Sequence, residues 1–224
     1  MALIARIKNR LGLMYRRHVL RDGFTLEIDR WFRDRGDETL RMDYPLTEDS
    51  VVFDVGGYLG DFAAEIQRRY GCRIYVFEPV PEFHRQCVAR FEGDPKVLCL
   101  KYGLSSRDGL FDIGLADNAS SFASPHAVGK VQQVEVRSVV ECIQQLGVES
   151  IDLLKINIEG GEFDVLPALI ASGDINRIRH LQVQFHNFVD GAASRRDRIR
   201  DDLAMTHAED WNYEFVWESW SRKT

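Results

Sequence analysis

Short apolar runs alternate along this chain with longer segments in which apolar residues recur every three or four positions, and the alternation begins at Val51. Apolar runs of about four to eight residues are typical of buried strands, whereas the wider spacing is typical of helices with one buried face. Strands that alternate with helices predict a parallel sheet covered on both faces. The runs that we interpret as strands are 51–54, 73–78, 96–102, 151–157, 180–185 and 213–217.

The segments between these strands carry the helical spacing. Predicted helices cover 62–70, 81–91, 139–146, a segment containing Phe163, Leu166 and Ile170, and 193–207. Two β segments are expected within 109–136, on either side of a polar loop, and residues 24–32 are interpreted as a short strand and turn. The predicted fold class is α/β. A Rossmann-like, doubly wound and mainly parallel sheet occupies residues 47–224, and residues 1–46 form an N-terminal helical extension that packs on or beside it.

The composition fits one soluble domain, with 45% hydrophobic and 29% charged residues in 224. A net charge of -6 gives no general attraction for a polyanion, so we expect no nucleic-acid partner. The four cysteines are widely spaced and form no CxxC pair, which is typical of reduced thiols in a cytoplasmic protein.

The first twenty residues mix basic and apolar side chains, so they resemble neither a signal peptide nor an anchor, and no run is long enough to span a membrane. Ile4, Ile7 and Leu11 lie at helical spacing and predict an amphipathic helix. Such a helix either packs over the domain or makes a weak contact with a membrane surface or a partner.

One apolar run leads directly into glycines, in the sequence VVFDVGGYLGDF at 51–62. Glycine lets a loop turn sharply and approach a ligand closely, and the start of the following helix offers unpaired N–H groups. Glu78 ends the next strand, where an acid is placed to accept hydrogen bonds from a ribose diol. The pattern predicts a nucleotide-type cofactor site formed by Asp54, Gly56, Gly57, Tyr58, Gly60, Glu78 and Pro79.

The spacing of the glycines separates two classes of cofactor. A dinucleotide site has a second glycine two residues after the first, where this chain has Tyr58, and a third three residues later, whereas Gly60 comes one residue early. The loop also lacks an arginine or lysine to face phosphates. S-adenosylmethionine, which carries no phosphate, therefore fits better than NAD.

At these positions the chain resembles the FkbM family of class I methyltransferases. The matching segments are 54–56 (DVG) with Gly60, 77–79 (FEP), 118–121 (NASS) and 152–162 (DLLKINIEGGE). The resemblance implies an S-adenosylmethionine fold and methyl transfer, usually to a hydroxyl of a sugar or secondary metabolite. Asn118 and Ser120 lie in a long polar loop that either closes over the adenosine or is a solvated turn.

Three positions depart from the family pattern. Asn157 stands where the family often has aspartate, Gln184 where it often has glutamate, and Tyr58 where it commonly has asparagine. Amides keep hydrogen bonding but remove the charge that a divalent cation requires. We therefore expect no required metal.

Methyl transfer to a hydroxyl requires alignment of donor and acceptor and removal of the acceptor proton. His186, just after a strand end, is the candidate base, and Glu159 either orients its imidazole or takes the proton itself. Asn157 and Lys155 are candidates to hold acceptor oxygens, and Lys155 could instead pair with Glu162. His186 could also only satisfy the strand end, and Glu162 could only cap a helix.

Two further groups have open interpretations. The arginines of 193–207 form either an ion-paired face or contacts with an anionic acceptor, and the aromatic residues of the last strand either fill the core or stack on a sugar. We expect an O-methyltransferase that acts on a saccharide, glycoconjugate or secondary-metabolite precursor, as in polysaccharide biosynthesis. The alternatives are a nicotinamide-dependent sugar oxidoreductase and a non-catalytic cofactor-binding module of a polysaccharide-assembly complex.

Overall fold

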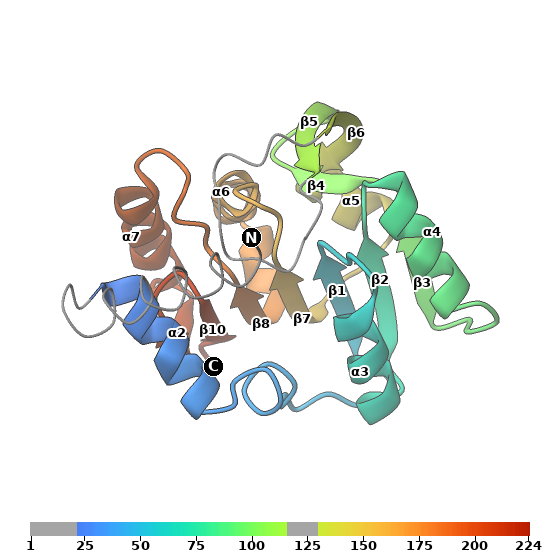
Figure 1. Cartoon of the computed structure of the whole chain (residues 1–224). Coiled ribbons are helices and arrows are strands. Elements are labelled where there is room, and N and C mark those ends of the chain that lie inside the picture. Colours follow the sequence, from blue (N-terminus) through green and yellow to red (C-terminus); the bar gives the residue numbers. More distant parts are fainter. Residues whose placement is uncertain (1–21, 116–129) are drawn as a thin grey trace, which may run out of the picture.

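A twisted central sheet organises the computed structural model, which describes residues 22–115 and 130–224 (Figure 1). Seven strands of the described chain lie in the order β3, β2, β1, β7, β8, β10, β9. Their bounds are Val51–Val55 (β1), Arg73–Phe77 (β2), Val97–Leu100 (β3), Ile151–Ile156 (β7), Ile178–Val183 (β8), His207–Tyr213 (β9) and Trp217–Arg222 (β10). Strands β1, β2, β3, β7 and β8 pair in parallel, and β10 runs antiparallel to both of its neighbours. The predicted α/β fold with a mainly parallel sheet is confirmed.

Helices cover both faces of this sheet (Figure 1). Their bounds are Gly23–Arg33 (α2), Asp61–Tyr70 (α3), Pro81–Arg90 (α4), Val139–Gln145 (α5), Glu162–Ser172 (α6) and Ala192–Leu203 (α7), with a 3-10 turn, η2, at Asp174–Arg177. Apolar side chains of α5, α6 and α7 form the larger core on one face. On the other face, α3 and α4 pack on β1, β2 and β3, and α2 packs on the β9–β10 hairpin.

A smaller sheet follows β3 in the chain. It contains β4 (Gly103–Ser105), β6 (Lys130–Ser138) and β5 (Gly109–Leu115), in that spatial order. The two β segments predicted within 109–136 are therefore confirmed as an antiparallel pair. The polar loop between them, with Asn118 and Ser120, lies outside the described residues.

The interpretation of residues 24–32 as a strand and turn was wrong. Asp22 caps a helix by accepting a hydrogen bond from the Thr25 amide at 3.1 Å, and α2 continues to Arg33. Phe24, Ile28 and Trp31 then share a helical face that packs against the end of the chain. These three residues are four and three positions apart, which is the helical period, and this period describes the segment better than the short alternation that suggested a strand.

The last predicted strand, 213–217, was also wrong. Residues 214–216 form a turn between the end of β9 at Tyr213 and the start of β10 at Trp217, and a hydrogen bond from the Val216 amide to the Tyr213 carbonyl closes it at 2.8 Å. Phe215 occupies the turn with a φ of +57°, a conformation that a bulky residue rarely adopts. The turn contains no glycine, so the run of aromatic residues gave no sign of it.

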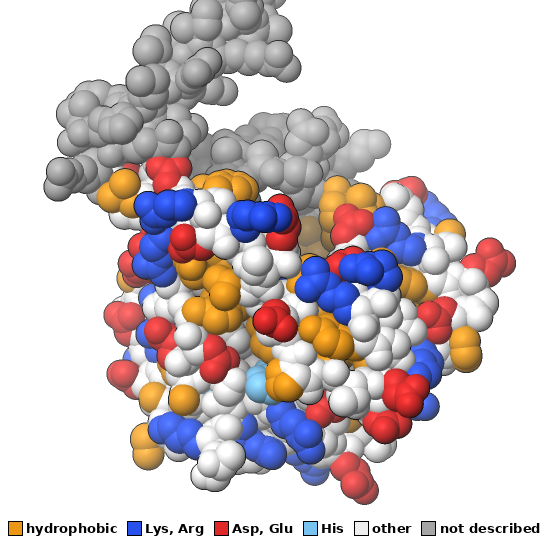
Figure 2. All heavy atoms as spheres, turned by 90° about the horizontal axis from the view of Figure 1, so that it is seen from below, with side chains coloured by type: hydrophobic (Ala, Val, Ile, Leu, Met, Phe, Trp, Pro, Cys, Tyr) orange, Lys and Arg blue, Asp and Glu red, His pale blue; other side chains and the backbone are white. Residues whose placement is uncertain are grey.

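None of the helices in the described part of the chain is long and apolar enough to span a bilayer. On the face in Figure 2, basic and acidic side chains are interspersed among apolar ones.

Candidate active site

Backbone hydrogen bonds join the carboxyl ends of four neighbouring strands into one edge. The Gly56 and Gly57 amides donate to the Phe77 carbonyl at 3.0 and 3.2 Å. The Asn157 amide donates to the Val55 carbonyl at 3.0 Å, and the same kind of bond ties the end of β8 to the end of β7 at 3.0 Å. The loops that follow β1, β2, β7 and β8 therefore meet at this edge, where ligands of open α/β sheets bind.

The glycine loop fits against this edge only because Gly56 and Gly57 lack a Cβ. A Cβ on Gly56, whose φ is +87°, would lie 2.0 Å from the Asn157 carbonyl oxygen, and one on Gly57 would lie 2.2 Å from Val76. Gly60, with a φ of +77°, is the N-cap residue that precedes α3. The loop therefore brings bare backbone to the end of β1, as the sequence predicted.

Tyr58 stands in this loop with a φ of +50°. Its ring packs edge-on against Phe83 of α4, with ring centroids 4.6 Å apart, and its carbonyl accepts a hydrogen bond from the Cys87 thiol at 3.1 Å. A non-glycine residue in the left-handed region stores strain, and these contacts hold it there. Phe83 was not identified from the sequence.

Glu78 is 5% exposed at the end of β2. One carboxylate oxygen accepts from the Tyr58 amide at 2.7 Å and the other from the Val80 amide at 2.8 Å, with half-buried Pro79 between. Burial raises the pKa of Glu78 to about 7, and these two backbone bonds oppose the shift. Glu78 therefore connects the glycine loop to the start of α4, the position expected for a ribose acceptor.

Lys155 does not lie where the sequence analysis placed it. It is 3% exposed, and its ammonium contacts the Asp54 carboxylate at 2.8 Å and donates to the Gly56 carbonyl at 2.7 Å. Burial lowers the pKa of Lys155, and Asp54 opposes the shift. The alternative pairing with Glu162 is not present either. A role in holding acceptor oxygens is therefore corrected to a buried support beneath the glycine loop.

Asp54 is fully buried at the end of β1. One oxygen binds Lys155, whereas Oδ2 is buried without a hydrogen-bond partner among the described residues. A buried carboxylate oxygen without a hydrogen bond is costly. Its position at the base of the glycine loop is consistent with a hydrogen-bond donor supplied by a bound ligand.

His186 follows β8 and lies against the loop that follows β7. Its Nδ1 is 2.9 Å from Oε1 of Glu162, and its backbone amide donates to the same oxygen at 2.8 Å. The Glu159 carboxylate is 4.0 Å from Nε2, and its side chain is 74% exposed. Glu162, rather than Glu159, orients the imidazole, which corrects the sequence analysis.

Burial and neighbouring charges shift the pKa of His186 in opposite directions. Burial lowers the pKa of His186, but the hydrogen bond and the charge of Glu162, with a smaller contribution from Glu159, raise it, and the net shift is upward. The link to Glu162 was missed because an acid at the start of a helix is explained by capping alone. The signal available was the second acid in the sequence IEGGE, three residues after Glu159.

The amides at this edge differ in exposure. Asn157 is half-buried and Gln184 is 5% exposed. Within residues 22–115 and 130–224, no three His, Cys, Asp or Glu side chains gather as a metal site would require. The expectation that no metal is required stays a prediction.

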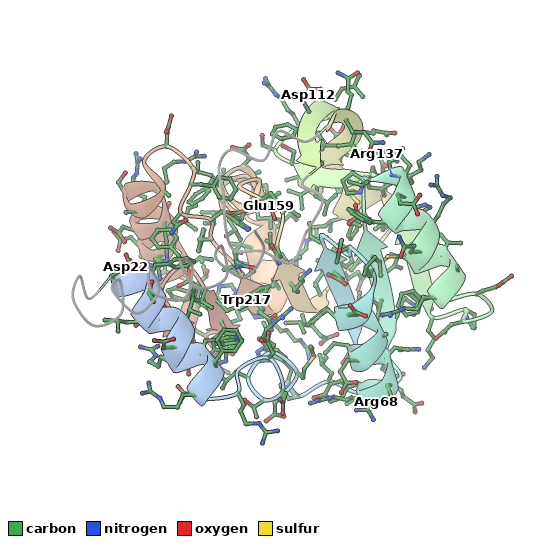
Figure 3. The ribbon with its side chains drawn as sticks, in the orientation of Figure 1. Asp22, Arg68, Asp112, Arg137, Glu159 and Trp217 are labelled. Carbon is green, nitrogen blue, oxygen red and sulfur yellow. The ribbon has the colours of Figure 1, made fainter. Side chains whose placement is uncertain are left out.

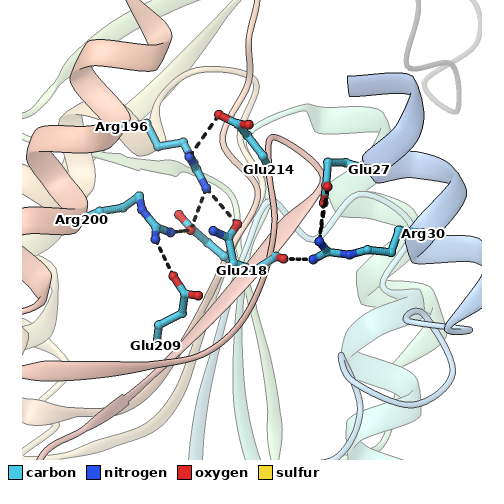
Figure 4. Close-up of polar contacts among 8 residues, drawn as sticks. Glu27, Arg30, Arg196, Arg200, Glu209, Glu214 and Glu218 are labelled. Atoms are coloured by element: carbon cyan, nitrogen blue, oxygen red, sulfur yellow. Dashed lines mark hydrogen bonds and ion pairs between the residues drawn. The ribbon is translucent and has the colours of Figure 1, made fainter. Parts of the chain in front are cut away.

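The arginines of the predicted helix at 193–207 are largely ion-paired (Figure 4). Arg196 contacts Glu218 at 3.1 Å, with both side chains buried, and Arg200 pairs with Glu218 and Glu209. The ion-paired interpretation is confirmed for these two, although the Arg196–Glu218 pair is shielded from solvent rather than solvated.

Aromatic residues near the end of the chain pack in the hydrophobic core, which was one of the two interpretations left open by the sequence. Tyr213 and Trp217 are buried with Trp31 of α2, and Trp220 belongs to the larger core. Figure 3 shows Glu159 beside α6 and Trp217 on the opposite side of the sheet, near α2.

The sheet order, the two helical layers and the glycine loop define a Rossmann-like methyltransferase fold. A solved structure of a putative rRNA methylase from Clostridium thermocellum superposes with a TM-score of 0.51 over 85% of this chain and 96% of that chain. The sequences are 9% identical, so this similarity concerns the fold alone.

The family profile described as the methyltransferase FkbM domain matches residues 54–215. This chain therefore belongs to the FkbM methyltransferase family. AMB antimetabolite synthetase AmbE of Pseudomonas aeruginosa is 25% identical over 72% of this chain, and Methyltransferase 1 of Beauveria bassiana is 25% identical over 56% of it. The match covers 10% of the first relative and 60% of the second.

Proposed function

We propose that this protein is an S-adenosylmethionine-dependent O-methyltransferase whose acceptor is a saccharide, glycoconjugate or secondary-metabolite precursor. The observation that carries the proposal is that His186 and the glycine loop lie at the same edge of the sheet. The end of β7 lies between them: it contacts Gly56 on one side and is hydrogen-bonded to the end of β8, which precedes His186, on the other. A cofactor cradle and a candidate base are thus neighbours. Activity in the cytoplasm stays a prediction.

The residues at the edge fit the proposed cofactor. Gly56 and Gly57 let the loop pack closely on the ends of β7 and β2, where a Cβ would collide, and Glu78 at the end of β2 carries carboxylate oxygens that suit ribose hydroxyls. The unpartnered Oδ2 of Asp54 is an acceptor suited to a donor of the ligand. When bound, S-adenosylmethionine supplies an electrophilic methyl carbon whose bond to sulfur breaks as the acceptor oxygen attacks.

The role of the chain is then to orient the acceptor and to remove its proton. We assign the proton to Nε2 of His186, because Nδ1 is already engaged by Glu162. Asn157, half-buried at the end of β7, is placed to hold an acceptor oxygen. Glu159 adds negative charge 4.0 Å from Nε2, which favours the imidazolium formed by proton transfer.

Phe188 supports an acceptor with an apolar face. Its side chain is 52% exposed, and its ring centroid lies 5.3 Å from that of His186. A large aromatic ring left exposed beside a candidate base offers a stacking surface to the C–H face of a sugar or to another ring. The preference for a saccharide itself rests on the family resemblance.

Calorimetry and methyl transfer test this function together. We expect binding of S-adenosylmethionine but not of NAD, and transfer of labelled methyl to a glycan or small-molecule pool. Binding of NAD alone would favour the sugar oxidoreductase, and cofactor binding without transfer to any acceptor would favour the non-catalytic module.

His186→Ala should lower turnover by about 10²–10⁴-fold, as loss of a general base does, with Asn187→Ala as the neighbouring control. Equal turnover in both variants would remove His186 as the base.

A further inference from the structure

The Glu162 carboxylate makes three hydrogen bonds while its side chain is fully buried. Oε2 accepts from the Gly160 amide at 2.9 Å. Oε1 accepts from the His186 amide at 2.8 Å and lies 2.9 Å from Nδ1 of His186. One side chain at the start of α6 therefore joins the loop after β7 to the segment after β8.

These contacts exceed what helix capping requires. A cap satisfies amides at the start of its own helix, which the bond from Gly160 does. The two bonds from His186 come instead from a different strand end, 24 positions away in the sequence. Burying a carboxylate is also costly unless its hydrogen bonds are complete, so the three bonds to Glu162 are needed to offset the cost of its burial.

The bond to Nδ1 fixes the tautomer of the imidazole. An ionised carboxylate can only accept hydrogen bonds, so Nδ1 must carry the hydrogen. In a neutral imidazole the lone pair then lies on Nε2, the nitrogen that faces Glu159. The imidazole is thereby ready to take a proton on the side away from Glu162.

We propose that Glu162 is a positioning residue that holds His186 as the Nδ1–H tautomer, with Nε2 free to accept the acceptor proton, and that fixes the loop carrying Glu159 in the same step. This inference rests on the proposed function, because it gives Glu162 its role through the base. The loop it holds is strained, since Glu159 has a φ of +52° and Gly160 a φ of +105°. Glutamate–histidine pairing of this kind sets both ring orientation and basicity in other acid–base sites.

Glu162→Gln tests the proposal with little change in shape. Either orientation of the amide disturbs the site. With NH₂ toward His186, Nδ1 must become the acceptor and Nε2 carries the hydrogen; with the oxygen toward His186, NH₂ faces the Gly160 amide and the charge that stabilises the imidazolium is lost. We expect kcat to fall by about 10²–10⁴-fold, with the acceptor KM and the affinity for S-adenosylmethionine changed by less than about threefold. The pH at which activity rises should also move lower, because the charge of Glu162 is lost while that of Glu159 remains.

Asp164→Asn is the matched control, since it removes another carboxylate from the first turn of α6 whose ion pair is with Arg195 and not with His186. We expect it to lower kcat by less than about fivefold. Adding Glu162→Gln to His186→Ala should cause no further loss, because a positioning residue has no role without its base.

Two outcomes separate this inference from the proposed function. If His186→Ala is inactive and Glu162→Gln keeps wild-type kcat and pH profile, the role of Glu162 is overturned and the base stands. If His186→Ala is fully active, the proposed base itself is overturned.

Nitrogen NMR of His186 in the unaltered protein tests the tautomer directly and does not depend on the folding of a variant. Above its pKa the ring should show a protonated Nδ1, and a protonated Nε2 would contradict the proposal.

Discussion

Ionisable side chains at the carboxyl edge of the sheet are buried, and their partners decide what each can do. Lys155 neutralises Asp54 beneath the glycine loop, while Glu162 engages His186 beside it. One ion pair, Lys155–Asp54, therefore lies under the proposed ligand site, and one hydrogen bond from an imidazole to a carboxylate, His186–Glu162, lies beside it. Breaking either pair would leave a buried charge without compensation, which is far more costly than losing a surface pair.

Glu78 gives a prediction on pH. Its pKa of about 7 means that part of it is protonated at neutral pH, whereas ribose hydroxyls donate to the ionised form. Binding should therefore release a proton, and the affinity for S-adenosylmethionine should rise with pH and level off above about 8. Well below pH 7 it should fall by about tenfold for each pH unit.

Calorimetry at several pH values, in buffers of different ionisation enthalpy, measures both the affinity and the proton release. Glu78→Gln should bind more weakly and lose the pH dependence. An affinity that falls as pH rises, or the same pH dependence in the variant, would contradict the assignment of Glu78 to the ribose.

At the scale of single residues, the sequence located the site better than it assigned roles. Gly56 and Glu78 lie at strand ends because apolar runs stop next to them, and the end of an apolar run is visible in a sequence. Whether Lys155 points outward or inward depends on its neighbour across the sheet, Asp54, which lies 101 positions away. Such pairings come from strand order, which periodicity alone does not provide.

The loop between β1 and α3 is the element in which backbone geometry is most restrictive. In Gly56→Ala the added methyl would meet the Asn157 carbonyl oxygen at 2.0 Å, and the residue would keep a φ near +87°. Backbone atoms cannot rotate away as a side chain can. We expect a loss of about 3 kcal/mol or more in the free energy of unfolding and loss of cofactor binding.

Gly71→Ala is the control within the same strand–helix–strand unit. Its φ is +63°, but nothing lies within 4 Å of the added Cβ. It should cost about 1–2 kcal/mol, from backbone strain alone, and leave cofactor binding intact. Urea unfolding and calorimetry of both variants make the comparison; equal effects would show that the contact with Asn157 is unimportant.

Elements were predictable where hydrophobic period, length and end signals agreed. The strand ending at Asp54 and the helix stopped by Gly71 meet all three conditions, and both lie close to where they were expected. Helix α2 failed because Phe24, Leu26 and Ile28 also alternate, so two periods fit the same few residues. The Asp22 cap would have favoured the helix.

At the scale of the whole molecule, α2 covers the β9–β10 hairpin. Trp31 is 3% exposed, packs edge-on against Tyr213 with centroids 5.0 Å apart, and donates to Asp37 at 3.1 Å. The segment that follows reaches the same face, where Arg41 binds Gln182 of β8 at 3.1 Å. Residues 22–46 are thus part of one packed structure with the sheet, whereas the proposed domain boundary at 46 and 47 stays a prediction.

Trp31→Ala should lower the free energy of unfolding by about 3–5 kcal/mol, because it leaves a cavity between α2 and the hairpin. Phe32→Ala is a close control, since the neighbouring ring is 63% exposed and should cost no more than about 0.5 kcal/mol. Denaturant unfolding followed by circular dichroism measures both. A small effect of Trp31→Ala would mean that α2 is only loosely attached.

The contact between α2 and the terminal hairpin also constrains the order in which the chain can fold. Asp34, just after α2, accepts a hydrogen bond from Tyr213 at 2.8 Å, across 179 positions of sequence. An isolated helix of 11 residues is marginal in water, so α2 gains stable burial only after residues 207–217 have left the ribosome. Helix α2, which precedes every strand of the described chain, is therefore buried only after the last of those strands has formed.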